Sequence, residues 1–333
     1  MRRPLVAVAD SVFPNLTPAR EVLSKVNAEL HLAEKPTAEA IMQVARDADA
    51  LLVTYAKVTA EMIGQMRRCR IIARFGIGVD NVDIAAATKA NIVVTRVPDY
   101  CIDEVSDHTM ALLLALARKI PFANSSVHAG RWEMPAVVPI YRLRGSVLGL
   151  VGFGRIPQFV APKAKAFGLK VISYDPFVSE ETMKSAGVEK VDFPELVSIS
   201  DHISIHCPLA PETNHLFDGE TFRRMKPTAY LINTARGSIV DEEALARALD
   251  QGQLAGAALD VLSQEPPTGS PLSGRDNVIL TPHMSFYSAE SLVDLQSKAA
   301  EEVVRVLTGE VPKNPVNPEA LNSSRERLAA LNQ

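Results

Sequence analysis

An arginine, a glutamate and a histidine follow three separate apolar runs in the last third of this 333-residue chain. Arg236 stands in INTARGSIVDEEAL, Glu265 in ALDVLSQEPP and His283 in LTPHMS. Because each apolar run is typical of a buried strand, we expect these side chains at the carboxyl ends of parallel strands, where open sheets bind ligands. A cation, a carboxylate and an imidazole at that edge could hold an anion and move a proton.

Hydride transfer to a carbonyl requires groups of these types, because the nascent alkoxide takes up a proton and the substrate carboxylate needs a cation. We predict that His283 is the acid/base, since imidazole titrates nearest neutral pH. Glu265 would orient the ring and favour its protonated form by charge attraction. Arg236 would bind a carboxylate through two parallel hydrogen bonds. Taken singly, each residue could equally be structural or solvated, and the three together favour catalysis.

A glycine turn with a later acid indicates a dinucleotide site. Gly152 and Gly154 in LGLVGFGRIP lie between an expected strand and an expected helix, where backbone amides can approach a pyrophosphate. Pro157 occupies the position of the third small residue of this fingerprint, and we expect Pro162 to kink the helix. Asp175 ends the next apolar run, where a carboxylate accepts from a ribose diol and repels a 2′-phosphate, so NAD is favoured over NADP. The alternative for Asp175 is a turn-forming role before Pro176.

Short apolar runs alternate with helix-period segments along the chain, and this alternation predicts an α/β protein. We expect two Rossmann-like, doubly wound parallel-sheet domains with a cleft between them. Residues 99–287 would form the NAD-binding domain, and residues 1–98 plus 288–333 a discontinuous substrate-binding domain. A helix is expected over about 103–118, followed by an irregular stretch from about residue 124. A stretch of this length inside a compact domain is usually functional or an interface arm.

Composition and charge exclude several classes of protein. The net charge of −4 gives no reason to expect nucleic acid or an anionic membrane as a partner. No apolar run is long enough to span a bilayer, and the amino terminus has no signal-peptide pattern, so we expect a cytoplasmic protein. The three cysteines show no pairing or metal spacing. His202 and His206 share a strand face without further ligands, so no metal is expected; His31, His108, His128 and His215 are interpreted as structural or surface residues.

Several motifs in fixed order give the chain a family resemblance over nearly its whole length. They are FGIGVDNVD (75–83), VGFGRI (151–156), YDP (174–176), HCPLAPET (206–213), INTARGSIVDEEAL (232–245), ALDVLSQEP (258–266) and TPH (281–283). The chain resembles the D-isomer-specific 2-hydroxyacid dehydrogenases. Within that family, TPHMSFYSAES is similar to the branch that contains phosphoglycerate dehydrogenases and C-terminal-binding-protein corepressors, with Phe286 at an aromatic position.

The resemblance implies NAD-dependent interconversion of a 2-oxo acid and a D-2-hydroxy acid in a homodimer, with the segment of about 119–146 as its dimerisation arm. It implies Arg236 as the substrate-binding arginine, Glu265 as the residue that tunes the histidine, and His283 as the acid/base. The implied cofactor contacts are Gly152, Gly154, Arg155, Ile156, Asp175, Cys207, Pro208, Thr213, Thr234, Ala235, Arg236, Asp260, His283 and Ser285, with Asp260 facing the nicotinamide amide.

The residues that choose the substrate are expected before position 145. Backbone amides around Ile77 and Gly78 are implied to hold the substrate carboxylate, and Tyr55, Lys57, Arg74, Tyr100 and Phe286 are candidates to line the pocket. Lys57 or Arg74 would meet a second anionic group, or else be a surface lysine and a structurally paired arginine. Trp132 is interpreted as a packing anchor, with contact to a neighbouring subunit as the alternative. The rival function is an NAD(H)-sensing, corepressor-like scaffold that binds partner peptides.

Overall fold

The computed structural model describes residues 2–321, without the side chains of residues 135 and 136, and the chain divides into two compact units. One unit is Met1–Tyr100 with Ser288–Gln333, and the other is Cys101–Tyr287. The first unit is therefore built from both ends of the chain. Within the described residues no helix is long and apolar enough to cross a membrane.

The discontinuous unit contains a five-stranded sheet in the order β2-β1-β3-β4-β5, and all of its pairings are parallel. This is a doubly wound order, in which the chain reverses direction across the sheet beside β1. The strands are β1 (Leu5–Val8), β2 (Glu29–Leu32), β3 (Ala50–Val53), β4 (Ile71–Arg74) and β5 (Val93–Thr95).

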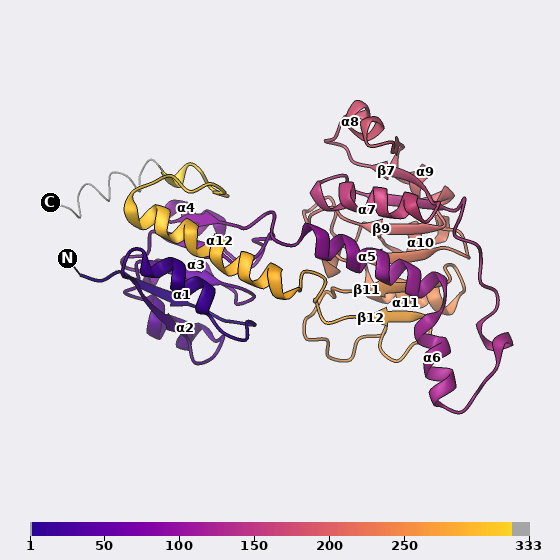
Figure 1. Cartoon of the computed structure of the whole chain (residues 1–333), viewed down its shortest axis with the longest axis horizontal. Helices are drawn as coiled ribbons and strands as arrows, with labels where there is room; N and C mark the ends of the chain where they lie inside the picture. Colours follow the sequence, from indigo (N-terminus) through magenta and orange to yellow (C-terminus); the bar gives the residue numbers. More distant parts are fainter. Residues whose placement is uncertain (1, 322–333) are drawn as a thin grey trace. The chain divides into compact units, whose positions relative to one another are not determined.

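Helices cover both faces of this sheet (Figure 1). The apolar faces of α2, α3 and α4 join the sheet in one core, while α1 packs on α12, which contacts β3 and β4. Side-chain caps start several of them, as Thr37 does for α2 by accepting from the Ala40 amide. The helices are α1 (Thr17–Ser24), α2 (Ala38–Ala45), α3 (Ala60–Gln65), α4 (Ile84–Lys89) and α12 (Ala289–Thr308).

The continuous unit contains a seven-stranded parallel sheet in the order β12-β11-β10-β9-β6-β7-β8. Six of these strands reproduce the doubly wound dinucleotide-binding order, with its switch point between β6 and β9, and β12 extends one edge. The strands are β6 (Val147–Val151), β7 (Lys170–Tyr174), β8 (Glu189–Lys190), β9 (His202–Ile205), β10 (Tyr230–Asn233), β11 (Gly256–Leu259) and β12 (Val278–Leu280).

Two separate apolar cores lie on the two faces of this sheet. α5 and α7 pack side by side on one face, and α9, α10 and α11 cover the other (Figure 1). The helices are α5 (Ile102–Ala117), α6 (Ile120–His128), α7 (Arg155–Ala166), α8 (Glu180–Ser185), α9 (Phe193–Ile199), α10 (Gly219–Arg224) and α11 (Glu242–Asp250), with short 3-10 turns η1 (Met134–Val137) and η2 (Gly237–Ile239).

The structure corrects one sequence expectation and refines another. Residues 124–128 are not irregular, because α6 continues to His128; Pro121 stands in its first turn, where a missing N–H costs nothing. Pro162 lies inside α7, and the helix nevertheless continues to Ala166. The exposed position of Pro162 and the buried apolar face of α7 explain why one lost hydrogen bond does not end the helix.

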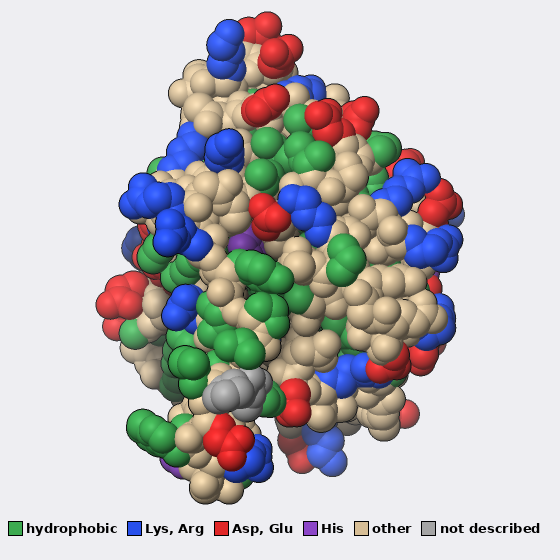
Figure 2. Space-filling view, turned by 90° about the vertical axis from the view of Figure 1, so that its right-hand side faces the viewer, with side chains coloured by type: hydrophobic (Ala, Val, Ile, Leu, Met, Phe, Trp, Pro, Cys, Tyr) green, Lys and Arg blue, Asp and Glu red, His purple; other side chains and the backbone are tan. Residues whose placement is uncertain are grey.

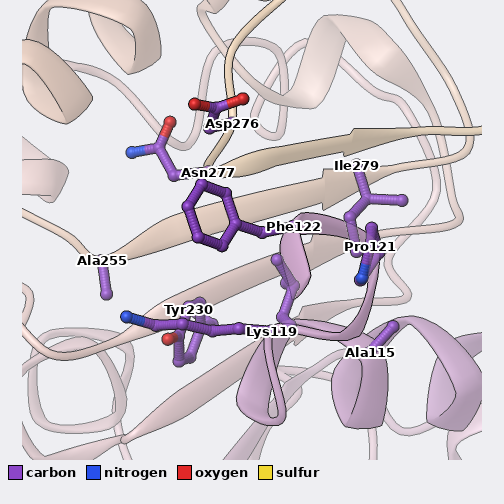
Figure 3. Close-up of a pocket in the computed structure, with 10 residues that line it drawn as sticks. Ala115, Lys119, Pro121, Phe122, Tyr230, Ala255, Asp276, Asn277 and Ile279 are labelled. Carbon is purple, nitrogen blue, oxygen red and sulfur yellow. The ribbon is translucent and has the colours of Figure 1, made fainter. Parts of the chain in front are cut away.

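A hollow of about 190 Å³ opens at the amino-terminal ends of β10, β11 and β12. Figure 3 shows Phe122 of α6, Tyr230 of β10 and Lys119 among its walls. None of the sequence-predicted site residues lines it. Because ligands of parallel sheets bind at the carboxyl ends of the strands, this hollow is not the expected cofactor site.

Candidate active site

Arg236 lies on a tight turn directly after β10. The turn is organised by Asn233, the last residue of the strand, whose side chain is fully buried. Its Nδ2 donates to the Arg236 carbonyl (2.9 Å), and its Oδ1 accepts from the Ala235 amide (3.0 Å). The Arg236 guanidinium donates through Nη1 to the Ala235 carbonyl (2.7 Å). The buried Asn233 amide therefore bonds to both the Ala235 amide and the Arg236 carbonyl, and it fixes the backbone at Arg236.

Gly237 lets this turn approach the segment that leads to Glu265. A Cβ built on Gly237 would overlap the Leu262 carbonyl group and the Ser263 nitrogen, which are backbone atoms and cannot rotate away. The Leu262 amide donates to Glu265 Oε1 (2.9 Å), and the Ser263 amide donates to Glu242 Oε1 (2.6 Å). The glycine is thus required by close contact of two main-chain segments.

Glu265 and His283 form a direct pair. Glu265 Oε2 lies 2.7 Å from His283 Nδ1, and the two side chains keep 34% and 23% of their accessible surface. Burial alone raises the pKa of the Glu265 carboxyl, but the hydrogen bond and charge of His283, the Leu262 amide and the charge of Arg236 together lower it below its ordinary value. Arg236, Glu265 and His283, which sequence analysis predicted to form one site, therefore interact electrostatically within one unit.

The loop that carries His283 is held by Asp260, the residue that follows β11. We call residues 281–285 the histidine loop. Asp260 Oδ1 accepts from the Thr281 hydroxyl (2.6 Å) and the Met284 amide (2.9 Å), and Oδ2 accepts from the Ser285 amide (2.8 Å). The His283 amide donates to the Asp260 carbonyl (2.8 Å). These bonds support a strained residue, since His283 has φ 50°, a left-handed conformation that costs a side-chain-bearing residue about 1–2 kcal/mol.

Helix α5 contributes two neighbouring polar side chains to this region. His108 Nε2 lies 3.2 Å from the Thr281 hydroxyl and 3.7 Å from Asp260 Oδ1. The hydroxyl of Thr109 lies 3.1 Å from that of Thr234, which begins the arginine turn. Sequence reasoning missed His108 and Asn233. The signal for Asn233 was its place at the end of an apolar run, whereas His108 stands in a helix with no local cue.

The glycine turn after β6 has the two geometries that a dinucleotide site requires. Gly152 has φ 96°, and a Cβ there would lie 2.9 Å from the Cys207 nitrogen. Gly154 is the N-cap of the twelve-residue helix α7, it offers no side chain to the first amides, and a Cβ on it would meet nothing within 4 Å. The amides of Arg155 and Ile156 thus begin a helix beside open space, as a phosphate site needs.

Asp175 links this turn to the end of β7. Its Oδ2 accepts from the Phe153 amide (2.8 Å), and its Oδ1 accepts from the amides of Phe177 (2.8 Å) and Val178 (3.2 Å). The carboxylate therefore has a turn-forming role, which was the alternative for this residue. Oδ2 has one partner among these amides and can accept a further bond, so the carboxylate remains able to bind a ribose hydroxyl.

The loop after β9 holds three more predicted cofactor residues, Cys207, Pro208 and Thr213. The Thr213 hydroxyl donates to the Pro208 carbonyl (2.7 Å) and accepts from the Ala210 amide (2.8 Å), so it shapes this loop. Burial raises the pKa of the Cys207 thiol to about 11, which keeps it neutral. Among the described residues, no three His, Cys, Asp or Glu side chains are grouped as metal ligands.

The predicted substrate residues before position 145 lie in the other unit, near the ends of three strands. Tyr55 and Lys57 follow β3, Arg74 ends β4 and is followed by Ile77 and Gly78, and Tyr100 follows β5. Asp10 accepts from the amides of Thr54 and Tyr55 at 2.8 and 2.6 Å, which fixes the loop that carries the exposed Lys57. Arg74 is buried, and its Nη1 donates to the Phe75 carbonyl (2.8 Å). Its guanidinium occupies the place where Gly76 would carry a Cβ.

This packing favours the structural interpretation of Arg74, which supports the loop bearing Ile77 and Gly78. Tyr100 is also buried, with 8% of its surface accessible. Phe286, by contrast, belongs to the same unit as His283, and their rings meet edge to face with centroids 6.2 Å apart.

Comparisons with known proteins agree on one family. The model for the D-isomer specific 2-hydroxyacid dehydrogenase NAD binding domain matches residues 110–285. A D-3-phosphoglycerate dehydrogenase of Methanocaldococcus jannaschii is 41% identical over 94% of this chain, which spans 59% of that relative's length. A glyoxylate reductase of Thermococcus litoralis is 39% identical over 89% of this chain and 92% of the relative.

Solved structures give the same result for the fold. A D-lactate dehydrogenase of Aquifex aeolicus, complexed with NAD and lactic acid, has a TM-score of 0.84 and 29% identity over 94% of this chain and 99% of its own. The TT0316 protein of Thermus thermophilus has a TM-score of 0.85 and 34% identity, also over 94% of this chain and 99% of its own.

Gly237→Ala should destabilise the protein strongly, because its new methyl group overlaps backbone atoms of residues 262 and 263. We expect a loss of about 2–4 kcal/mol in the free energy of unfolding, measured by urea titration. Gly154→Ala is the matched control, since its Cβ meets nothing within 4 Å; it should leave unfolding nearly unchanged while weakening NADH binding. Equal stability of the two variants would contradict this account of Gly237.

Glu265 should make the fold more stable at neutral pH than at acid pH. Its pKa is lower in the folded chain than the ordinary 4.5, so its stabilisation is present above the unfolded value and is lost as pH falls through the folded value. The stability difference between wild type and Glu265→Gln, from urea titrations between about pH 3 and pH 7, should therefore shrink on acidification. A difference that stays constant or grows below about pH 4 would contradict the assigned sign.

Proposed function

The chain belongs to the D-isomer-specific 2-hydroxyacid dehydrogenase family, and we propose that it interconverts a 2-oxo acid and a D-2-hydroxy acid with NAD. The observation that carries this proposal is the Glu265–His283 pair at 2.7 Å, with the charge of Arg236 acting on the same carboxyl group. An oriented imidazole beside a guanidinium suits a substrate that carries a carbonyl and a carboxylate.

The ring nitrogen that transfers the proton follows from which nitrogen of His283 is hydrogen-bonded to Glu265. Its carboxylate takes His283 Nδ1, so Nε2 faces away from it and is the atom that gives a proton to the carbonyl oxygen, or removes it from the hydroxyl in the reverse direction. The carboxylate stabilises the imidazolium that this exchange requires and fixes the plane of the ring. Glu265 thus orients the ring and His283 transfers the proton.

Arg236 is assigned to the substrate carboxylate. Its backbone is fixed by Asn233 and by the close approach at Gly237, so the guanidinium starts from a rigid turn. Two parallel N–H bonds to a carboxylate would place the adjacent carbonyl between Arg236 and His283. Lysine cannot reproduce that geometry, because its ammonium is a single point charge.

The residues present fit the cofactor of this family. Gly154 leaves open space at the start of α7, the Arg155 and Ile156 amides form the N-terminus of that helix, and Asp175 Oδ2 retains acceptor capacity for a ribose. When bound, the nicotinamide supplies the hydride that reduces the carbonyl carbon. Thr234, Ala235, Asp260 and Ser285 are proposed to border it, since they surround the arginine turn and the histidine loop.

The substrate is proposed to be a small 2-oxo acid. Whether it also carries a distal anionic group depends on which cations of the chain can bind one. The relatives that match are named for 3-phosphoglycerate and for glyoxylate, which differ in that group. Lys57 is exposed on a fixed loop, whereas Arg74 is only 9% exposed and donates through Nη1 to the Phe75 carbonyl, so Lys57 is the better candidate to meet a distal phosphate or carboxylate.

Reduction of 2-oxo acids by NADH should depend on His283. We expect wild type to oxidise NADH with at least one acid of a panel containing glyoxylate, pyruvate and 3-phosphohydroxypyruvate, measured by absorbance. His283→Ala should lower kcat by about a thousandfold or more while the affinity for NADH changes little. His31→Ala, an exposed histidine on β2, is the matched control and should keep wild-type turnover.

The rival function makes a different prediction for the same panel. Tight NADH binding with no turnover of any acid would favour an NAD(H)-sensing scaffold that binds partner peptides. Turnover that survives His283→Ala would instead refute His283 as the proton donor, but the protein would still be a dehydrogenase.

We also propose a homodimer formed through α6 and the segment that follows it. Trp132 keeps 87% of its accessible surface and Met134 keeps 76%, so Trp132 does not anchor packing within its own unit. Figure 2 shows hydrophobic side chains gathered on the part of the face where α6 lies. An exposed apolar patch of this kind is typical of a protein interface. Other exposed apolar residues of this stretch are Ile120, Val127, Val138 and Tyr141.

Charges on this arm should separate the subunits. The variant with both Trp132→Asp and Met134→Asp should sediment as a monomer where wild type sediments as a dimer, because it would bury two carboxylates in an apolar interface. Phe177→Asp is the control, since Phe177 is 94% exposed outside the arm and should not change the mass. A wild-type monomer would refute the dimer. The cytoplasmic location and the absence of membrane and nucleic-acid partners stay predictions from the sequence.

A further inference from the structure

We propose that His108 of α5 is a positioning residue, which holds the histidine loop in place through Thr281 and Asp260. This inference rests on the proposed role of His283 and adds a residue that touches neither substrate nor cofactor in that scheme. His108 lies 175 positions before His283 in the chain, and neither Thr281 nor Asp260 is its sequence neighbour. Its link to them is made only by the fold.

The direction of the hydrogen bonds follows from the number of hydrogens available. Thr281 has one hydroxyl hydrogen, and its oxygen lies 2.6 Å from Asp260 Oδ1, a carboxylate that only accepts. Thr281 therefore donates to Asp260. Its oxygen can then only accept from His108, whose Nε2 lies 3.2 Å away. His108 must carry its hydrogen on Nε2, and the three side chains form one directed chain from the helix to the carboxylate.

The environment of Asp260 explains why such a chain matters. Only 1% of this residue is accessible to solvent, so its carboxylate depends on protein groups for compensation. Three bonds come from the histidine loop itself, at Thr281, Met284 and Ser285. His108 Nε2 lies 3.7 Å from the same carboxylate, so its ring N–H adds a further favourable dipole beside it.

The carboxylate in turn fixes His283 from both sides. Its bonds reach Thr281 two residues before His283, and Met284 and Ser285 directly after it, while the Asp260 carbonyl accepts from the amide of His283 itself. A residue at φ 50° keeps that conformation only when its surroundings impose it. Weakening the Asp260 cluster should therefore free the imidazole from the orientation that Glu265 and the substrate require.

Helix α5 is a suitable anchor for this cluster. It is 16 residues long, and one side of it is buried in the core that contains β6, β7, α7 and α8. The next residue, Thr109, bonds to Thr234 at the start of the arginine turn. Two consecutive side chains of one rigid helix thus reach the two segments that carry Arg236 and His283, and they fix both to a common frame.

The test compares His108→Leu with His108→Gln in the full-length protein. Leucine fills the space without a donor, and we expect kcat to fall about 10- to 100-fold while KM for the 2-oxo acid and the affinity for NADH change less than about threefold. Glutamine carries an N–H donor of similar reach, so it should restore kcat to within about fivefold of wild type. His31→Leu is the matched control on an exposed site.

Two measurements separate positioning from general loss of structure. With NADH deuterated at the transferred position, the isotope effect on kcat should rise in His108→Leu, because the chemical step becomes slower. Amide hydrogen exchange should become faster in the peptide covering residues 280–287, without NADH or substrate present, and stay unchanged in the strands. A uniform loss of active protein would lower the rate without either signature.

A double-mutant cycle tests the chain of bonds. Thr281→Val breaks the middle of it, so the variant with both His108→Leu and Thr281→Val should be no slower than the slower single variant, within about threefold. Multiplicative losses would show that the two side chains act separately and would overturn the proposal, as would wild-type kcat and hydrogen exchange in His108→Leu.

Failure of this inference can be told apart from failure of the proposed function. If His283→Ala abolishes turnover and His108→Leu does not slow it, only the positioning role of His108 is refuted. If His283→Ala turns over at the wild-type rate, the assigned proton donor is wrong. The exchange rate of residues 280–287 still reports in that case on whether His108 holds the loop.

Discussion

The parallel register of β10, β11 and β12 is the constraint on which the candidate active site depends. Asn233 pairs with Leu259, and Leu259 pairs with Leu280, so the three strands end side by side at one edge of the sheet. The loops that leave these ends carry Arg236 and His283 three residues later and Glu265 six residues later. Charged residues that are far apart in the sequence therefore lie close together because the strands before them are paired in register.

The sheet edge supplies proximity, and buried polar side chains supply orientation. Asn233 is completely buried and satisfies the arginine turn, while Asp260 is 1% exposed and satisfies the histidine loop. A buried polar group that lost its partners would cost several kcal/mol, so each loop has one arrangement that meets this demand. Asn233 and Asp260 thus fix the backbone from which Arg236 and His283 extend, and neither of them transfers a proton in the proposed chemistry.

Much of the fold could be predicted from the sequence because apolar runs and helix periods are local signals. They located the strands that end at Asn233 and Leu259, and the types and spacing of Arg236, Glu265 and His283 indicated the site at their ends. His108 could not be assigned in this way, because nothing in its helix distinguishes a histidine that faces Asp260 from one that faces solvent. Arg74 could not be assigned from the sequence either. Its burial against its own loop favours a structural role over substrate binding, and the sequence left both roles open.

Two glycines show how opposite physical reasons can lie behind the same residue type. Gly237 is needed because backbone atoms of the Glu265 segment already occupy the place of a Cβ, so it closes the structure around Arg236. Gly154 is needed where nothing lies within 4 Å of that place, so it keeps the start of α7 open. In the sequence, both residues are simply glycines that follow an expected strand, so their different roles cannot be distinguished there. Only the neighbouring atoms distinguish Gly237, which lets the Arg236 turn contact the Glu265 segment, from Gly154, which leaves room for the proposed cofactor.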